Sequence, residues 1–272
     1  MSTNSCAVLR QALLGSLLAT CLLLWAGAPS AQALTISDGV GSITVSDGTG
    51  GLTDFTVNGA NDLFEIRYFY RTSAMSQEIP IVGRFAGPAV SSVSQTAPDT
   101  ITVLGSVTEF DYQLDYVLLG DSLSLSLTVD ETNGLPLSLS LFSYQDWDVD
   151  GPGGGDFLAW DGTVMTVSDP PLTRTIDVTT TTAADATEAA NWPALQNAFQ
   201  DAGVTNLTDG AGLPFGPGDA SFAFQYDRVI AANGSTTIDM EFAVIPEPDS
   251  GRLIALGLLG LGLARKRRSS FQ

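Results

Sequence analysis

The sequence contains no histidine, and only two of its 272 residues are cysteine, Cys6 and Cys21. Without histidine the chain cannot form a Ser-His-Asp or Cys-His catalytic group, or the common ligand sets for zinc and copper. Both cysteines lie in an apolar N-terminal stretch that is expected to be removed, so the remaining chain should hold no disulfide. Its stability must come from a hydrophobic core, for which roughly 210 residues are ample.

Positive charge is scarce as well. Between residues 34 and 245 there are 28 Asp and Glu residues against 5 Arg and no lysine, a formal balance of 5 − 28 = −23. Such a surface repels nucleic acid and anionic lipid, so we expect no nucleic-acid partner. It suits an exported soluble domain, and it could also hold hard cations such as Ca²⁺. Solubility alone is the simpler explanation of this charge.

The N-terminus has the features of a secretory signal peptide. Arg10 is the only charged side chain in the first 37 residues, and it precedes the Leu- and Ala-rich stretch 12–28. Ala31 and Ala33 supply the small residues at the −3 and −1 positions of a cleavage site. Residues 1–33 are therefore predicted to be removed during export, with an N-terminal membrane anchor as the alternative.

Alternation of apolar and polar residues with a period of two predicts strands in the domain that follows, residues 34–245. Residues 63–71 predict a half-buried strand. Its core face would carry Phe64, Ile66, Tyr68 and Tyr70, and its exposed side Glu65, Arg67 and Arg71.

Residues 109–144 show the same alternation over a longer stretch, with leucine and tyrosine on one side and Asp, Gln and Ser on the other. Leucines at this spacing would scatter around a helix, whereas a strand places them on one face. Asn133-Gly134 is a hairpin signal. The pattern predicts three antiparallel strands in a meander.

Further short strands are predicted at residues 43–45, 55–57, 164–167, 173–179, 221–226 and 236–245. One helix interrupts them, opened by Trp192-Pro193 and ended by Gly203. Many short antiparallel strands separated by turn residues predict an all-β fold class, an antiparallel β-sandwich of jelly-roll-like type with one short helix.

The acidic stretch 146–156 is the most distinctive part of this domain. Asp146, Asp148 and Asp150 precede a glycine, as at the start of a calcium loop, and Asp156 could supply a late ligand. The stretch departs from an EF-hand because Phe157 stands where the last ligand, glutamate, belongs. Two interpretations remain open: a Ca²⁺ site formed by these four aspartates, or an acidic turn between strands.

Other features near this stretch point less clearly to a function. Trp147 and Trp160 could form a platform for a sugar ring, or could be core aromatics. Asp148 and Asp161 could be the carboxylate pair of a glycoside hydrolase, spaced ~5–10 Å apart, but so acidic a chain always offers such pairs. No catalytic residue is assigned, and the domain is predicted not to be an enzyme. Ca²⁺ is the one cofactor considered.

The C-terminal residues 246–272 consist of three parts in order. They are the motif Pro246-Glu247-Pro248, the apolar run 253–264 and the basic cluster Arg265-Lys266-Arg267-Arg268. As a helix the 12-residue apolar run spans ~18 Å, against ~30 Å of hydrocarbon in a bilayer. It is predicted to be a weak transmembrane anchor whose basic end stays in the cytoplasm.

This arrangement resembles the PEP-CTERM sorting signal of proteins that exosortases process in Gram-negative bacteria. The resemblance implies an exosortase-type partner, transient insertion into the inner membrane and cleavage near the motif. It also implies delivery to the cell surface or to an extracellular matrix or biofilm, often alongside exopolysaccharide. It implies no activity for the β-domain. The sequence thus predicts an exported, non-enzymatic β-sandwich sorted at the membrane, with a calcium-dependent carbohydrate-binding module as the alternative.

Overall fold

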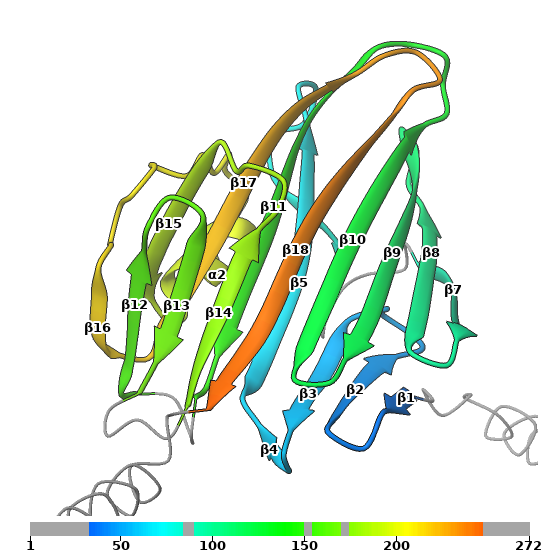
Figure 1. Cartoon of the computed structure of the whole chain (residues 1–272). Helices are drawn as coiled ribbons and strands as arrows, with labels where there is room; N and C mark the ends of the chain where they lie inside the picture. Colours follow the sequence, from blue (N-terminus) through cyan, green and yellow to red (C-terminus); the bar gives the residue numbers. More distant parts are fainter. Residues whose placement is uncertain (1–32, 84–89, 150–153, 170–173, 247–272) are drawn as a thin grey trace, which may run out of the picture. The chain divides into compact units, whose positions relative to one another are not determined.

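The computed structural model describes residues 33–83, 90–149, 154–169 and 174–246 (Figure 1). The chain divides into two units, and all of the described residues belong to the second, Ala33–Gln272. They form three antiparallel sheets of nine, five and four strands, together with one helix. The predicted fold class, an antiparallel β-sandwich with one short helix, is confirmed.

The nine-stranded sheet forms one layer of the sandwich (Figure 1). Its strands in spatial order are β16 (Phe215–Gly218), β12 (Asp156–Trp160), β13 (Val164–Ser168), β14 (Arg174–Thr180), β18 (Ser235–Pro246), β10 (Ser122–Glu131), β9 (Phe110–Leu119), β8 (Thr100–Ser106) and β7 (Val90–Ala97). From Ser122 to Val129 of β10 every second residue is a fully buried leucine or valine, and the serines and the threonine between them are half-buried. This is the alternation that the sequence predicted.

The five-stranded sheet packs on the nine-stranded one. Its strands in spatial order are β15 (Ala186–Asn191), β17 (Ala220–Ile230), β11 (Leu137–Trp147), β5 (Leu63–Thr72) and β6 (Ile79–Val82). Ring contacts join the layers: the Trp147 and Phe242 centroids lie 5.4 Å apart, and those of Tyr70 and Phe110 lie 5.0 Å apart. These residues belong to one continuous core.

The four-stranded sheet is built from the first strands of the domain. It comprises β1 (Ala33–Ser37), β2 (Gly41–Ser46), β3 (Leu52–Val57) and β4 (Ala60–Asn61). It contacts β7, β8 and β9 of the large sheet and β5 of the five-stranded sheet. The Tyr116 hydroxyl donates a hydrogen bond to the Gly50 carbonyl at 2.9 Å, which ties the turn between β2 and β3 to β9.

Helix α2 (Ala194–Gln200) covers the other face of the five-stranded sheet. Phe199 stacks on Phe69 of β5 with 5.0 Å between ring centroids, and lies 5.2 Å from the Phe142 ring of β11. The five-stranded sheet is thus covered on both faces. The prediction that Glu65 and Arg67 lie on an exposed side of their strand is therefore wrong, since both side chains are buried and paired with each other.

The predicted three-stranded meander is correct only for its first two strands. β9 and β10 pair as a hairpin, but β11 crosses to the other sheet and lies between β5 and β17. Asn133-Gly134 therefore lies in a connection between the two layers. Alternation along a strand indicates which face of that strand is buried, but it does not determine which neighbouring strand pairs with it.

The predicted export and sorting segments lie almost wholly outside the described residues. Ala33 is the first residue of β1 and Pro246 is the last residue of β18, while Ala31, Glu247, Pro248 and the basic cluster are outside. Among residues 33–246, as far as they are described, no helix has the length and apolar character of a membrane span.

Candidate functional site

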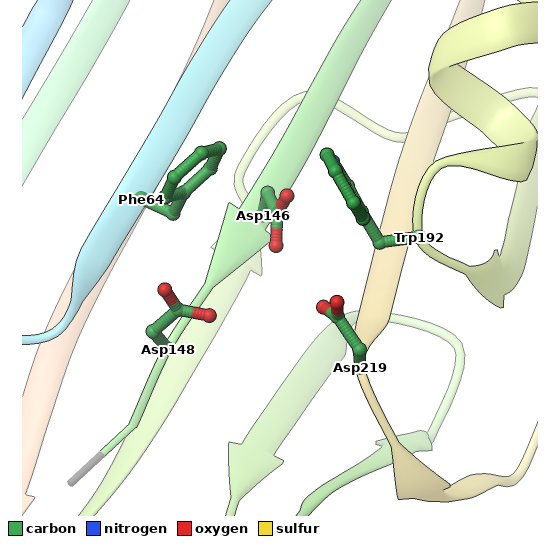
Figure 2. A pocket seen from close by; sticks show the side chains of 5 residues that line it. All are labelled: Phe64, Asp146, Asp148, Trp192 and Asp219. Atoms are coloured by element: carbon green, nitrogen blue, oxygen red, sulfur yellow. The ribbon is translucent and has the colours of Figure 1, made fainter. Parts of the chain in front are cut away.

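Three carboxylates and two aromatic rings line one small pocket beside β11 and β17 (Figure 2). The lining residues are Phe64, Asp146, Asp148, Trp192 and Asp219. The pocket has a volume of about 130 Å³, which is small against the ~300–1,000 Å³ of pockets that enclose drug-sized ligands. Its size suits one small ring rather than a long chain.

Strand register brings the carboxylates together. Asp146 and Asp148 are two residues apart at the end of β11, so their side chains leave the strand on the same side. Asp146 pairs with Ser221 of β17, and Asp219 lies two residues before Ser221, beside Asp148. Carboxylate oxygens of the three aspartates lie within 4.8 Å of one another.

A β-bulge supplies the first aromatic ring. On β11 the neighbouring residues Asp146 and Trp147 pair with Glu65 and Leu63 of β5, so Phe64 is the extra residue of the bulge. Bulges turn side chains out of the regular alternation and are common beside functional sites. Here the bulge turns Phe64 toward the pocket, while Leu63 remains in the core.

The second ring comes from the segment between β15 and α2. The Trp192 backbone N–H donates a hydrogen bond to the Asp219 carbonyl at 2.7 Å, which holds the tryptophan beside the acidic cluster. Its side chain remains 37% exposed. The Phe64 and Trp192 ring centroids lie 6.5 Å apart at an interplanar angle of 77°, so the rings meet edge to face at the pocket (Figure 2).

Asp146 is the most buried of the three carboxylates, with 2% of the residue exposed. Its Oδ2 accepts a long hydrogen bond of 3.4 Å from the Tyr144 hydroxyl, whereas its Oδ1 has no hydrogen-bond partner among the described residues. Burial raises the pKa of Asp146 to about 8, and the negative charges of Asp148, Asp219 and Glu65 add to this. Burial also raises the pKa of Asp219.

Glu65 is held in place next to Asp146. On the β5–β11 ladder it pairs directly with Asp146. Its Oε1 accepts a hydrogen bond from Arg67 Nε at 2.9 Å, and its Oε2 accepts one from Gln196 Nε2 of α2 at 3.2 Å. The charge of Glu65 is thus balanced by Arg67, and α2 is fixed over this end of the sheet.

The predicted calcium ligands are brought together in part. Asp146 and Asp148 meet in the pocket, while Asp150 lies outside the described residues. Asp156, the first residue of β12, is buried, and one of its carboxylate oxygens has no hydrogen-bond partner within the described part of the chain. Burial raises the pKa of Asp156 to about 7, with contributions from the charges of Asp148, Asp169 and Asp219, so it lies in the same acidic environment.

The remaining sequence candidates have structural roles. Trp147 is fully buried in the core, and Trp160 packs against Phe224 with ring centroids 5.5 Å apart. Asp161 accepts hydrogen bonds from the backbone N–H groups of Thr163 and Val164, which closes the turn between β12 and β13. Trp147 is thus a core residue and Trp160 a half-buried residue packed against the core, and neither lines the pocket.

Sequence reasoning did not find Phe64, Trp192 or Asp219. Asp219 stands 71 residues after Asp148 (219 − 148), and only the pairing of β11 with β17 makes them neighbours. The position of Asp219, two residues before the predicted strand 221–226, was the only signal available. Trp192 was recognised only as the start of a helix, and Phe64 was assigned to the core face because a bulge cannot be read from alternation.

Comparison with known proteins identifies the fold and no family. No family model matches the chain, and the search of curated proteins found no match. Solved structures with a similar fold include the Slr1438 protein from Synechocystis sp. PCC 6803, at 12% identity with a TM-score of 0.54, covering 80% of this chain and 97% of that one. A structure from Escherichia coli K12 named as an aldose 1-epimerase matches at 14% identity with a TM-score of 0.50, covering 79% and 99%.

A bacterial glucoamylase bound to acarbose also shares the fold, at 11% identity with a TM-score of 0.58. The match covers 85% of this chain and 35% of the glucoamylase, so the chain spans about a third of that enzyme's length. The prediction that the domain is not an enzyme is contradicted by these comparisons, because sugar-processing enzymes are built on the same fold. At these identities the likeness itself concerns the fold: an antiparallel β-sandwich of the kind found in aldose 1-epimerase and glucoamylase.

Proposed function

We propose that this domain is a carbohydrate-active protein that takes one neutral sugar unit into the pocket between Phe64 and Trp192. The observation that carries the proposal is the meeting of two aromatic rings and three carboxylates in one small pocket. The apolar face of a sugar ring packs against aromatic side chains, and its hydroxyl groups donate hydrogen bonds to carboxylates. The names of the structural neighbours, glucoamylase and aldose 1-epimerase, point to the same class of ligand.

The charge and size of the pocket define the ligand further. With no cation bound, the negative charge of the three carboxylates, which lie within 4.8 Å of one another, repels a uronic acid or a sugar phosphate, so the preferred sugar is uncharged. A volume of about 130 Å³ favours a single sugar unit over an enclosed oligosaccharide.

Carboxylates at such a position can also carry out chemistry on the sugar. Opening an aldose ring and hydrolysing a glycosidic bond both require a group that takes a proton from a hydroxyl or gives one to an oxygen at the anomeric centre. Paired carboxylates do this in many sugar-processing enzymes. The absence of histidine from the chain therefore does not prevent turnover of a sugar in this pocket.

Calorimetry in calcium-free buffer with neutral monosaccharides and disaccharides tests the binding, and polarimetry and reducing-sugar release test the turnover. We expect Trp192→Ala to weaken sugar binding about tenfold, which corresponds to ~1.4 kcal/mol, because one of the two rings is lost. Trp192→Phe keeps an aromatic face and should retain most of the affinity.

Phe157→Ala is the matched control for the loss of an aromatic side chain. Phe157 has nearly the same exposure as Trp192, 36% against 37%, but belongs to β12 and does not line the pocket. Its removal should leave sugar binding unchanged. Equal losses in the two alanine variants, or no binding by the unaltered protein of any neutral sugar, would refute the assignment of this pocket.

We further propose that the domain is exported and sorted to the cell surface or extracellular matrix by an exosortase-type enzyme. The signal-peptide features of residues 1–33 and the tripartite tail 246–272 support this proposal. The last described strand, β18, ends at Pro246, the first residue of the motif, so a cut after this residue would leave every described strand on the domain. A sugar-binding domain would then be delivered to a site where exopolysaccharide is present.

A further inference from the structure

We infer that Asp146, Asp148 and Asp219 together bind a calcium ion in the pocket. The inference shares the pocket with the proposed sugar function but does not depend on it, because the geometry of the carboxylates alone supports it. It also differs from the calcium loop that the sequence suggested. The ligands come from the ends of two paired strands, β11 and β17, rather than from one continuous loop.

The spacing of the oxygens suits calcium. Calcium binds oxygen ligands at 2.3–2.6 Å, so oxygens on opposite sides of the ion lie up to ~5 Å apart, and three carboxylates within 4.8 Å of one another fall inside this span. Magnesium demands near-ideal octahedral geometry and usually keeps several waters, so calcium is the better match to a cluster of protein carboxylates. Figure 2 shows the three carboxylates directed toward a common space.

A second observation points to a ligand at this place. Asp146 is 98% buried, since 2% of the residue is exposed, and its Oδ1 has no hydrogen-bond partner among the described residues. A buried carboxylate oxygen without a partner costs free energy, and buried polar atoms in folded proteins are normally satisfied by a group, a water or an ion. Because Asp146 lines the pocket, a cation there would satisfy this oxygen.

The three carboxylates are like charges held close together at the ends of paired strands. Like charges that face each other across paired strands are destabilising, and here the register of β11 and β17 sets Asp219 beside Asp148 with Asp146 adjoining both. A divalent cation reverses the sign of this interaction, because each carboxylate is then attracted to the ion between them. The site should therefore stabilise the ends of β11 and β17 when it is filled.

Calcium alone is the probe for the test, with no sugar present. We expect calorimetry of the purified full chain to show one calcium ion bound per molecule, and thermal unfolding to shift upward by several degrees at millimolar calcium because the ion binds only the folded state. Magnesium should bind at least tenfold more weakly than calcium.

Asp219→Asn removes one ligand charge at a half-buried position with little change in size, and should weaken calcium binding at least tenfold. Asp146→Asn should do the same if circular dichroism shows that it folds, and Asp219→Asn decides the question if it does not. Asp47→Asn, at an exposed turn between β2 and β3, removes the same charge elsewhere and should leave binding unchanged.

Three results would overturn the inference: no binding at millimolar calcium, binding that Asp219→Asn leaves unaltered, or an equal loss of affinity in Asp219→Asn and Asp47→Asn. The last would mean that calcium is attracted only by the overall negative charge. None of these outcomes bears on sugar binding, which is measured without calcium, so this inference and the proposed function can fail independently.

Discussion

At the scale of single residues, Glu131 shows how one carboxylate can hold two turns. Its Oε2 accepts hydrogen bonds from the backbone N–H of Gly134 at 3.0 Å and of Asn233 at 2.8 Å, and its Oε1 accepts one from Asn133. Gly134 lies in the crossover between the sheets, and Asn233 lies in the hairpin between β17 and β18. The hydrogen bonds from Asn233, Asn133 and Gly134 lower the pKa of Glu131, because they favour its charged form.

Glu131→Gln should lower the stability of the domain at neutral pH, because an amide replaces one accepting oxygen with a donor. The folded-state pKa is lowered, so the carboxylate contributes stability above the unfolded-state pKa of about 4.5 and loses it as the pH falls through the folded-state value. The difference between variant and parent in urea unfolding should thus be largest near pH 7 and shrink below pH ~4.

Glu241→Gln, on the exposed side of β18, is the control and should unfold like the parent across this range. A stability difference for Glu131→Gln that stays constant from pH 7 to pH 3 would mean that the charge of Glu131 is not the cause.

At the scale of elements, helix α2 decides which face of the five-stranded sheet is exposed. Phe199 is fully buried among Phe69, Phe142 and Tyr144, all on the face of the sheet opposite the sandwich core. Seven residues are too few for a helix that is stable by itself, so α2 depends on this packing. The helix in turn covers the end of the sheet where Glu65 and Asp146 lie.

Phe199→Ala should destabilise the domain by ~3–5 kcal/mol, as expected for removal of a large buried aromatic side chain. Urea unfolding measures the loss. Val204→Ala, in the exposed segment after the helix, should change stability by no more than ~0.5 kcal/mol. A similar small effect for both variants would show that α2 is not held by the sheet.

Elements also show how far the sequence could predict this fold. β5, β13, β14 and β18 were predicted close to their observed bounds, and the hairpin of β9 and β10 was predicted within residues 109–144, because alternation and turn residues are local signals. The partner of β11 could not be predicted, since pairing is decided by packing between distant segments. The burial of Glu65 and Arg67 was missed for the same reason: it depends on α2, which follows more than 120 residues later.

The candidate site was predictable only where its residues are close in sequence. Asp146 and Asp148 could be found from their spacing, whereas Asp219 enters through strand register and Phe64 through a bulge. Neither the register between distant strands nor the position of a bulge can be read from a single sequence. Absence of histidine correctly excluded several mechanisms but did not justify excluding catalysis, because carboxylates can act on sugars without it.

At the scale of the whole molecule, the proposed export and sorting predict the mass of the mature protein. We expect the protein recovered from the surface of its host to lack residues 1–33 and the basic cluster Arg265-Lys266-Arg267-Arg268, because the signal peptide and the tail are both cut. Intact-mass spectrometry measures this. Replacing the four basic residues by serine should leave signal-peptide removal unchanged and impair sorting, since the cytoplasmic stop is lost.

An extracellular protein that keeps these four residues would contradict the sorting proposal. It would leave the sugar and calcium proposals unaffected, because the pocket lies wholly among residues 64–219.

The bulge at Phe64 has a consequence for how such a site can arise. Deleting this one codon would restore an uninterrupted ladder between β5 and β11 and remove the ring from the pocket in a single step, while Leu63 and the rest of the strand kept their places in the core. The aromatic ring beside the acidic cluster can therefore be gained or lost through a one-residue change in chain length, without any substitution among the side chains that hold the sandwich together.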